Sequence, residues 1–134
     1  MDMITLDTHQ KEELIDVTGK VRQIVAASGV ADGLCHIFCR HTTAGLTINE
    51  NADPDVKRDI LMALSRMVSD DWPYKHGEGN SPAHLKSSIM GCQLSIPIRS
   101  GRLELGTWQG ILFAEFDGPR HGRRIHITVI HSGG

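Results

Sequence analysis

The sequence lacks several features that would point to a particular class of protein. Its 134 residues carry 14 Lys and Arg against 16 Asp and Glu, a formal net charge of −2, so it lacks the cationic excess that neutralises nucleic-acid phosphates. No run approaches the roughly 20 apolar residues that cross a bilayer. The N-terminus has no cationic stretch followed by an apolar one, as a secretory signal would. We therefore expect neither a nucleic acid nor a membrane as a partner, and a cytoplasmic location.

Cysteine is also scarce. The three cysteines, Cys35, Cys39 and Cys92, form an odd set without the paired spacing of a zinc ribbon. Two of them lie in the apolar run GLCHIFC, which favours small buried thiols in a strand over a redox or metal role. The chain has no internal repeat, low-complexity tract or linker, and its length suits one domain spanning residues 1–134.

Two helices are predicted in the first half of the chain. Residues 18–28, TGKVRQIVAAS, place apolar side chains at helical spacing, with Thr18 as the cap and Gly29 as the stop. A second helix follows Asp53-Pro54 and should end near Asp70, because a proline is favoured at the first helical position. Its apolar stripe is expected to face the core and comprises Val56, Ile60, Leu61, Leu64, Met67 and Val68.

A third, short helix is also predicted. Ser81 would be its N-cap, Pro82 its first residue, and Gly91 would end it. The other ordered segments either alternate apolar and polar residues or are apolar throughout, and both patterns are typical of strands. They are residues 3–9 and 13–18, joined by a hairpin turn near residue 11, then 33–41, 45–50, 92–99, 101–106, 110–118 and 123–131. We therefore predict an α+β fold: a single compact domain of mostly antiparallel, sandwich-like sheets with about three helices packed on them.

Polar residues concentrate in three segments at the ends of these elements: residues 40–55, 76–84 and 106–123. The first two carry the histidines His41, His76 and His84, and neutral imidazole is a common ligand of zinc and related metals. Three ligands with an open fourth position are typical of catalytic zinc. Eight histidines in the chain also leave a chance grouping open, since no tight ligand motif is present.

The predicted helix start at Ser81 could bind an anion instead of a metal, because unpaired N–H groups and the helix dipole favour negative charge there. Gly77 and Gly79 would let the backbone approach a phosphate, with Lys86 and Ser87 one turn further on. A capped surface helix without a ligand explains the same segment equally well.

Three carboxylates, Glu50, Glu78 and Glu115, are candidates for proton transfer. Glu115 interrupts the apolar run ILFAEF, so it must face solvent, face a cavity or have a partner such as an arginine. The arginines at 120, 123 and 124 could clamp a phosphate or a carboxylate, or form a charged turn. Trp108 and Gln109 are expected to be packed or to lie at an interface.

Three blocks of sequence together resemble one known family. HTTAGLTINENADPDV, HGEGNSPAHLKSS and LGTWQGILFAEFDGPR look like the signature blocks of the YjbQ-like family, also called the secondary thiamine-phosphate synthase family, and the match runs from about Gly33 to His131. The resemblance implies a compact α+β homotrimer with polar clefts at the subunit boundaries. It also implies the joining of a hydroxymethylpyrimidine diphosphate to a thiazole phosphate with loss of diphosphate.

Residue roles follow from the resemblance together with the chemistry above. We expect metal ligands at His41, His76 and His84, catalytic roles for Glu50, Glu78 and Lys86, and substrate or anion binding by Asn51, Asn80, Ser81, Ser87 and Arg120. Histidine ligands favour zinc or another transition metal as the divalent ion, with magnesium possible although no acidic cluster is present. Two alternatives remain: a metal-dependent hydrolase of a phosphorylated small molecule, and a non-catalytic trimeric protein that binds a metabolite or metal.

Overall fold

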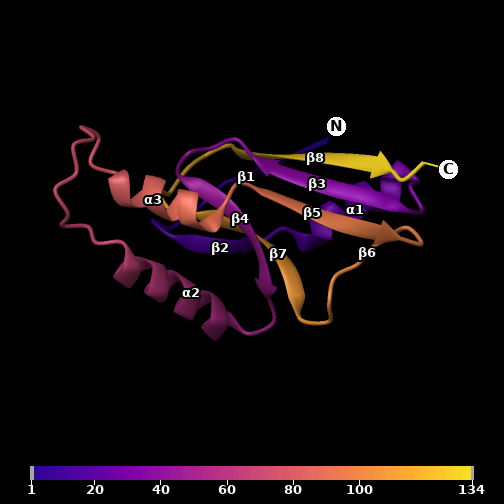
Figure 1. Cartoon of the computed structure of the whole chain (residues 1–134), viewed down its shortest axis with the longest axis horizontal. Coiled ribbons are helices and arrows are strands. Elements are labelled where there is room, and N and C mark those ends of the chain that lie inside the picture. Colours follow the sequence, from indigo (N-terminus) through magenta and orange to yellow (C-terminus); the bar gives the residue numbers. More distant parts are fainter. Residues whose placement is uncertain (1, 134) are drawn as a thin grey trace.

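The computed structural model describes residues 2–133 and contains three helices and two sheets (Figure 1). The helices are α1 (Thr18–Ser28), α2 (Pro54–Met67) and α3 (Ser81–Met90). The strands are β1 (Asp2–Leu6), β2 (Glu13–Asp16), β3 (Gly33–Cys39), β4 (Ala44–Glu50), β5 (Gln93–Arg99), β6 (Arg102–Leu103), β7 (Gln109–Glu115) and β8 (Arg123–His131). No helix of the described residues is long and apolar enough to span a membrane.

The strands form two antiparallel sheets, which confirms the predicted α+β class. The larger sheet has the order β1-β8-β3-β5-β6 and the smaller one the order β2-β7-β4. In β8 the predicted alternation holds: Ile125 and Ile127 are buried, whereas Arg124 is exposed. The predicted strand at 101–106 is shorter than expected, because only Arg102 and Leu103 pair with β5.

The smaller sheet is covered on both faces, and this explains the long apolar run of β7. Ile111 and Phe113 point toward the larger sheet and pack in the main core with residues such as Ile37, Ile127 and Val21. The alternate residues Leu112, Ala114 and Phe116 point the other way, into a second core formed with Leu14, Leu64 of α2 and Ala83 of α3. β7 is therefore a central strand with two dry faces, and Glu115 lies on the face directed into the main core.

Three local predictions were wrong in their details. The first two strands do not form a hairpin, because β1 pairs with β8 and β2 with β7, in different sheets. The first helix begins at Thr18 with Val17 as its cap, and Asp16 accepts hydrogen bonds from both the backbone and the hydroxyl of Thr18. The second helix ends at Met67, which is 60% exposed, so this residue is not part of a buried stripe.

The third helix begins one residue earlier than predicted, at Ser81 instead of Pro82. Asn80, not Ser81, is the cap, and neither side chain caps the helix by a hydrogen bond. The amide nitrogen of Asn80 donates instead to Oδ2 of Asp117 at 2.9 Å. A tertiary contact thus engages the side chain that local preference would have used as a cap.

Short contacts hold α3 against β4. The buried hydroxyl of Ser87 donates to the Ala44 carbonyl at 2.6 Å, and the Leu46 N–H donates to the Gly91 carbonyl at 3.0 Å. Gly45 faces this crossing: a Cβ there would lie 2.6 Å from the Gly91 carbonyl oxygen. The glycine therefore lets the end of α3 lie directly on the strand, which sets the position of the whole helix.

We expect Gly45→Ala to lower the free energy of unfolding by about 2 kcal/mol, because the added methyl forces α3 away from β4. Gly19→Ala is the matched control, since nothing lies within 4 Å of a Cβ there, and it should leave stability unchanged or raise it by up to about 1 kcal/mol. Urea denaturation at one fixed protein concentration measures both. Equal effects at the two positions would contradict the close approach.

Candidate functional site

A polar cleft of about 390 Å³ opens where four segments meet at one end of the sheets. The β3–β4 loop, the α2–α3 loop, α3 and the β7–β8 segment all contribute to it. Its lining comprises Arg40, His41, Thr42, Thr43, His76, Glu78, Asn80, His84, Arg120 and Arg123. The structure therefore brings the three predicted histidines into one cleft, although they come from segments separated by up to 43 residues of sequence.

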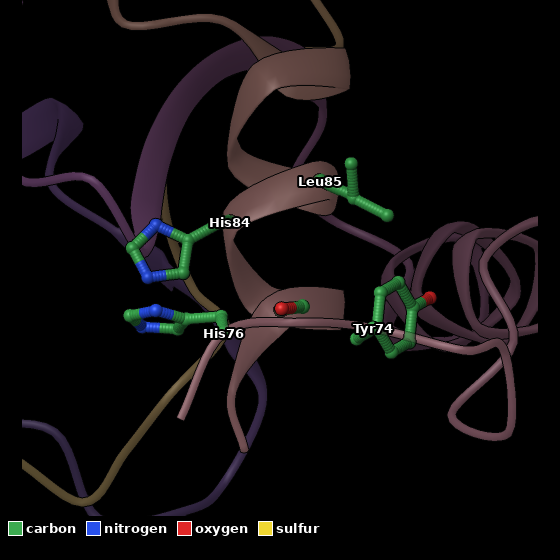
Figure 2. A pocket seen from close by; sticks show the side chains of 5 residues that line it. Tyr74, His76, His84 and Leu85 are labelled. Atoms are coloured by element: carbon green, nitrogen blue, oxygen red, sulfur yellow. The ribbon is translucent and has the colours of Figure 1, made fainter. Parts of the chain in front are cut away.

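Two of the histidines are direct neighbours. The ring centroids of His76 and His84 lie 5.2 Å apart with the rings perpendicular. Figure 2 shows the two labelled imidazoles next to each other. His76 comes from the loop before α3 and His84 from the first turn of that helix, so the eight-residue separation is closed by the turn at residues 77–80. Glu78 also approaches His76, with 4.0 Å between its Oε2 and Nε2 of the imidazole.

His41 is held in a defined orientation by the main chain. The backbone N–H of Arg124 donates to its Nε2 at 2.9 Å, so in the neutral ring the proton is on Nδ1. Desolvation, together with the nearby positive charge of Arg123, lowers the pKa of His41 below its ordinary value. At neutral pH this residue is therefore an uncharged hydrogen-bond donor.

This arrangement bears on the predicted metal site. A metal-bound imidazole uses a nitrogen lone pair, and the lone pair of His41 Nε2 already accepts the Arg124 N–H. Within residues 2–133, no three His, Cys, Asp or Glu side chains lie close enough together to hold a metal ion. The side chains as arranged do not fit a three-histidine metal centre, and the divalent ion stays a prediction.

The arginines of the cleft differ in how firmly they are held. Arg123 is buried and contacts both oxygens of Glu115: its Nε donates to Oε1 at 2.9 Å and its Nη2 to Oε2. The same Nη2 donates to the Thr43 hydroxyl at 2.9 Å. Arg120 is half exposed and pairs with Asp117 at 2.8 Å. Arg40 is exposed and has no ion pair with a carboxylate among the described residues.

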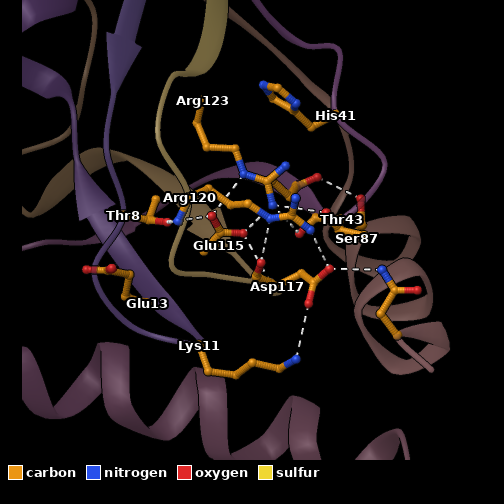
Figure 3. A network of polar contacts seen from close by, with 12 residues as sticks. Thr8, Lys11, Glu13, His41, Thr43, Ser87, Glu115, Asp117, Arg120 and Arg123 are labelled. Carbon is orange, nitrogen blue, oxygen red and sulfur yellow. Dashed lines mark hydrogen bonds and ion pairs between the residues drawn. The ribbon is translucent and has the colours of Figure 1, made fainter. Parts of the chain in front are cut away.

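Glu115 has no exposed surface, and four donors satisfy its carboxylate (Figure 3). Besides Arg123, the Thr8 hydroxyl donates to Oε1 at 2.7 Å and the Asp117 N–H to Oε2 at 3.1 Å. Burial alone would raise the pKa of Glu115, but the hydrogen bonds from Arg123, Thr8 and Asp117 outweigh it and lower the pKa below 4.5. Of the alternatives that the sequence left open, the arginine partner is the one observed.

Asp117 links the cleft wall to the start of α3 and to the β1–β2 loop. Its carboxylate accepts from Lys11 at 3.1 Å, from Asn80 at 2.9 Å and from Arg120 at 2.8 Å. Although burial raises the pKa of Asp117, these hydrogen bonds lower it overall. The carboxylate therefore stays ionised and orients Arg120 and Asn80 along the cleft.

Several predicted site residues lie elsewhere. Lys86 is on the opposite side of α3 from His84, where its ammonium pairs with Glu12 at 2.6 Å and donates to Ser65 at 3.2 Å. Only 6% of its side chain is exposed. The hydroxyl of Ser87 is used to attach α3 to β4, and neither residue lines the cleft. Ser81 lines an adjoining pocket.

Glu50 and Asn51 are at the other end of β4. The cleft borders the start of that strand, and seven residues of strand separate its ends by about 20 Å. Asn51 donates there to Asp16 at 2.8 Å, and Trp108, which is 66% exposed, offers its carbonyl to the Asn51 N–H at 3.2 Å. Within one chain, these residues do not join the three histidines.

The structure also adds residues that sequence reasoning did not assign to the site. Arg40, Thr42 and Thr43 flank the predicted His41 and line the cleft with it. Their position directly after a buried strand was the available signal, because a polar run at a strand end is commonly where functional side chains lie.

The fold and the cleft define a class of small α+β domains in which arginine and histidine side chains meet at one end of two antiparallel sheets. The chain belongs to the YjbQ-like family, because the family model described as UPF0047 protein YjbQ-like matches residues 2–132. A UPF0047 protein of Methanocaldococcus jannaschii is 50% identical, with 93% of this chain and 90% of that protein covered. The UPF0047 protein YugU of Bacillus subtilis is 47% identical, over 87% and 89%.

Solved structures agree with this assignment. A crystal structure of a YjbQ/UPF0047 family protein from Clostridium acetobutylicum has a TM-score of 0.94 and 52% identity, covering 97% of this chain and 100% of that one. A YbjQ-like protein of Sulfolobus solfataricus also has a TM-score of 0.94, at 36% identity, with 98% and 96% covered. The family suggested by the three sequence blocks is thus confirmed.

We expect Glu115→Gln to cost about 3 kcal/mol of unfolding free energy at pH 7, because it leaves Arg123 buried without a counter-charge. The pKa of Glu115 is lowered by folding, so its contribution is present above the unfolded-state value and is lost as the pH falls through the folded one. The difference between wild type and variant should therefore shrink below about pH 4.5.

The control is Glu78→Gln, which alters an exposed carboxylate of the same cleft and should change stability by less than about 0.5 kcal/mol. Chemical denaturation across pH 3–7 would follow both variants. A constant difference between wild type and Glu115→Gln over this range would exclude the buried ion pair as its source.

Proposed function

We propose that the cleft binds the phosphate or diphosphate of a small molecule and that the protein is a transferase of the thiamine-phosphate synthase type. One observation carries the proposal: three arginines and three histidines converge on the cleft, whose lining includes a single carboxylate residue, Glu78. Arginine donors match phosphate oxygens in a planar, bidentate geometry. A hydroxymethylpyrimidine diphosphate and a thiazole phosphate are substrates of this chemical kind.

The proposed reaction needs developing negative charge to be stabilised. The bond between the pyrimidine methylene carbon and the diphosphate oxygen breaks, the electron pair leaves with diphosphate, and the thiazole nitrogen forms the new bond to carbon. Fixed positive groups at the leaving oxygens lower the barrier most when they are already oriented. Arg123 and Arg120 have that rigidity, since Glu115 and Asp117 hold them, and exposed Arg40 is free to close on the phosphate.

The histidines would complete the site as donors. His41 presents Nδ1–H because its Nε2 accepts from the main chain. His76 and His84 stand side by side and are suited to donate to, or protonate, the departing diphosphate. Glu78, close to His76, keeps its proposed role in proton transfer, whereas the buried ion pair of Lys86 favours a structural role for that residue.

A homotrimer and a divalent metal also belong to the proposal. Because Glu50 and Asn51 lie about 20 Å along β4 from the cleft of their own chain, they could take part only in the cleft of a neighbouring subunit. His76 and His84 offer two imidazoles to a metal ion. Any further protein ligand would have to come from a rearrangement or from another subunit. The cytoplasmic location likewise remains a prediction.

Turnover of the two substrates tests the enzymatic part. We expect His84→Ala and Arg120→Ala to reduce product formation at least about 100-fold, since each removes a donor from the leaving group. His131→Ala, which alters an exposed histidine at the far end of β8, should keep full activity. Circular dichroism and sedimentation would verify fold and oligomeric state.

The same assay separates the alternatives. Phosphate or diphosphate release from one substrate alone would indicate a hydrolase. Phosphate binding without any turnover would indicate a non-catalytic binding protein. Undiminished turnover by a folded His84→Ala variant would refute the assignment of the cleft as the reaction site.

Metal content tests the proposed ligands separately. Protein purified without chelator should contain a transition metal by elemental analysis, and the double variant His76→Ala, His84→Ala should lose most of it. His9→Ala, His131→Ala serves as the matched double control, because both residues are exposed and lie outside the cleft. Full metal content in the folded cleft variant would show that these imidazoles are not the ligands.

A further inference from the structure

A second pocket, of about 300 Å³, adjoins the polar cleft and shares two of its walls. It is lined by Tyr74, His76, Ser81, His84 and Leu85. His76 and His84 therefore border both cavities, with the arginines on one side and the second pocket on the other. A molecule that occupied both cavities would pass these two imidazoles.

The second pocket differs from the cleft in chemistry. Its lining contains no Lys, Arg, Asp or Glu. Figure 2 shows the two imidazoles on one side of the α3 ribbon and the Tyr74 ring and Leu85 side chain on the other. The Tyr74 hydroxyl already donates to the Ser69 carbonyl, so Tyr74 lines the pocket with its aromatic ring. Leu85, the residue after His84 on α3, is 37% exposed.

We propose that this second pocket is the subsite for a flat, uncharged ring of the substrate, joined by a short linker to the phosphate or diphosphate in the polar cleft. The inference rests on the proposed function and specifies it further. Aromatic and aliphatic side chains bind a ring by removing its apolar surface from water, while a few polar groups fix its orientation. The linker would lie beside His76 and His84, where those residues can reach the oxygen that joins it to phosphorus.

Three simple probes separate the two subsites. Inorganic phosphate and methyl phosphate offer only the anion, whereas benzyl phosphate adds a ring on a one-carbon linker. Calorimetric titration of the protein should give an affinity for benzyl phosphate about tenfold above that for methyl phosphate, as partial burial of one ring predicts. Leu85→Ser should reduce this ratio to about two, because it removes one wall of the ring site.

The matched control is Ile89→Ser, one turn further along the same helix. Ile89 is 52% exposed and does not line the pocket, so the ratio should stay near the wild-type value. A wild-type ratio near one, or an equal loss in both variants, would overturn the ring subsite while leaving phosphate binding intact. If none of the three probes binds, the proposed function fails and the subsite fails with it.

Discussion

The buried pair of Glu115 and Arg123 connects the core of this protein to its cleft. Glu115 lies on the face of β7 that points between the two sheets, where an ion without a partner would be strongly destabilising. Arg123 neutralises it from the start of β8, and Thr8 and the Asp117 N–H occupy the remaining acceptor positions. The pair therefore dictates how the segment between β7 and β8 must leave the core.

The cleft inherits its geometry from that constraint. Arg123 also donates to Thr43, so the β3–β4 loop that carries Arg40 and His41 is attached to the same buried group. The Arg124 N–H, one residue on, orients the His41 ring. Cleft side chains from two distant segments are thus positioned by one ion pair and its neighbours, which gives the site the rigidity that charge stabilisation requires.

Helix α3 divides two environments. His84 faces the cleft, while Lys86, about 200° around the helix axis, faces Glu12 and Ser65. The residues on either side of this pair attach the helix, with Ala83 in the second core and Ser87 on the Ala44 carbonyl. A block of sequence that looks uniformly polar and functional is therefore divided between residues that line the cleft and residues that support the helix. This division explains why several of its residues were predicted for the site yet lie outside it.

Local patterns in the sequence were sufficient for the α+β class, the approximate extent of the helices and most strands, and the placing of polar segments at element ends. They were sufficient because the period of the apolar residues and the positions of glycine and proline determine local structure over only a few residues. Blocks of sequence also identified the family. Strand pairing, the true caps at Val17 and Asn80, and the separation of Glu50 from the histidines were decided by tertiary structure alone. Each depends on contacts between residues far apart in the chain, such as Asn80 with Asp117, and no local pattern records which distant partner a polar group will find.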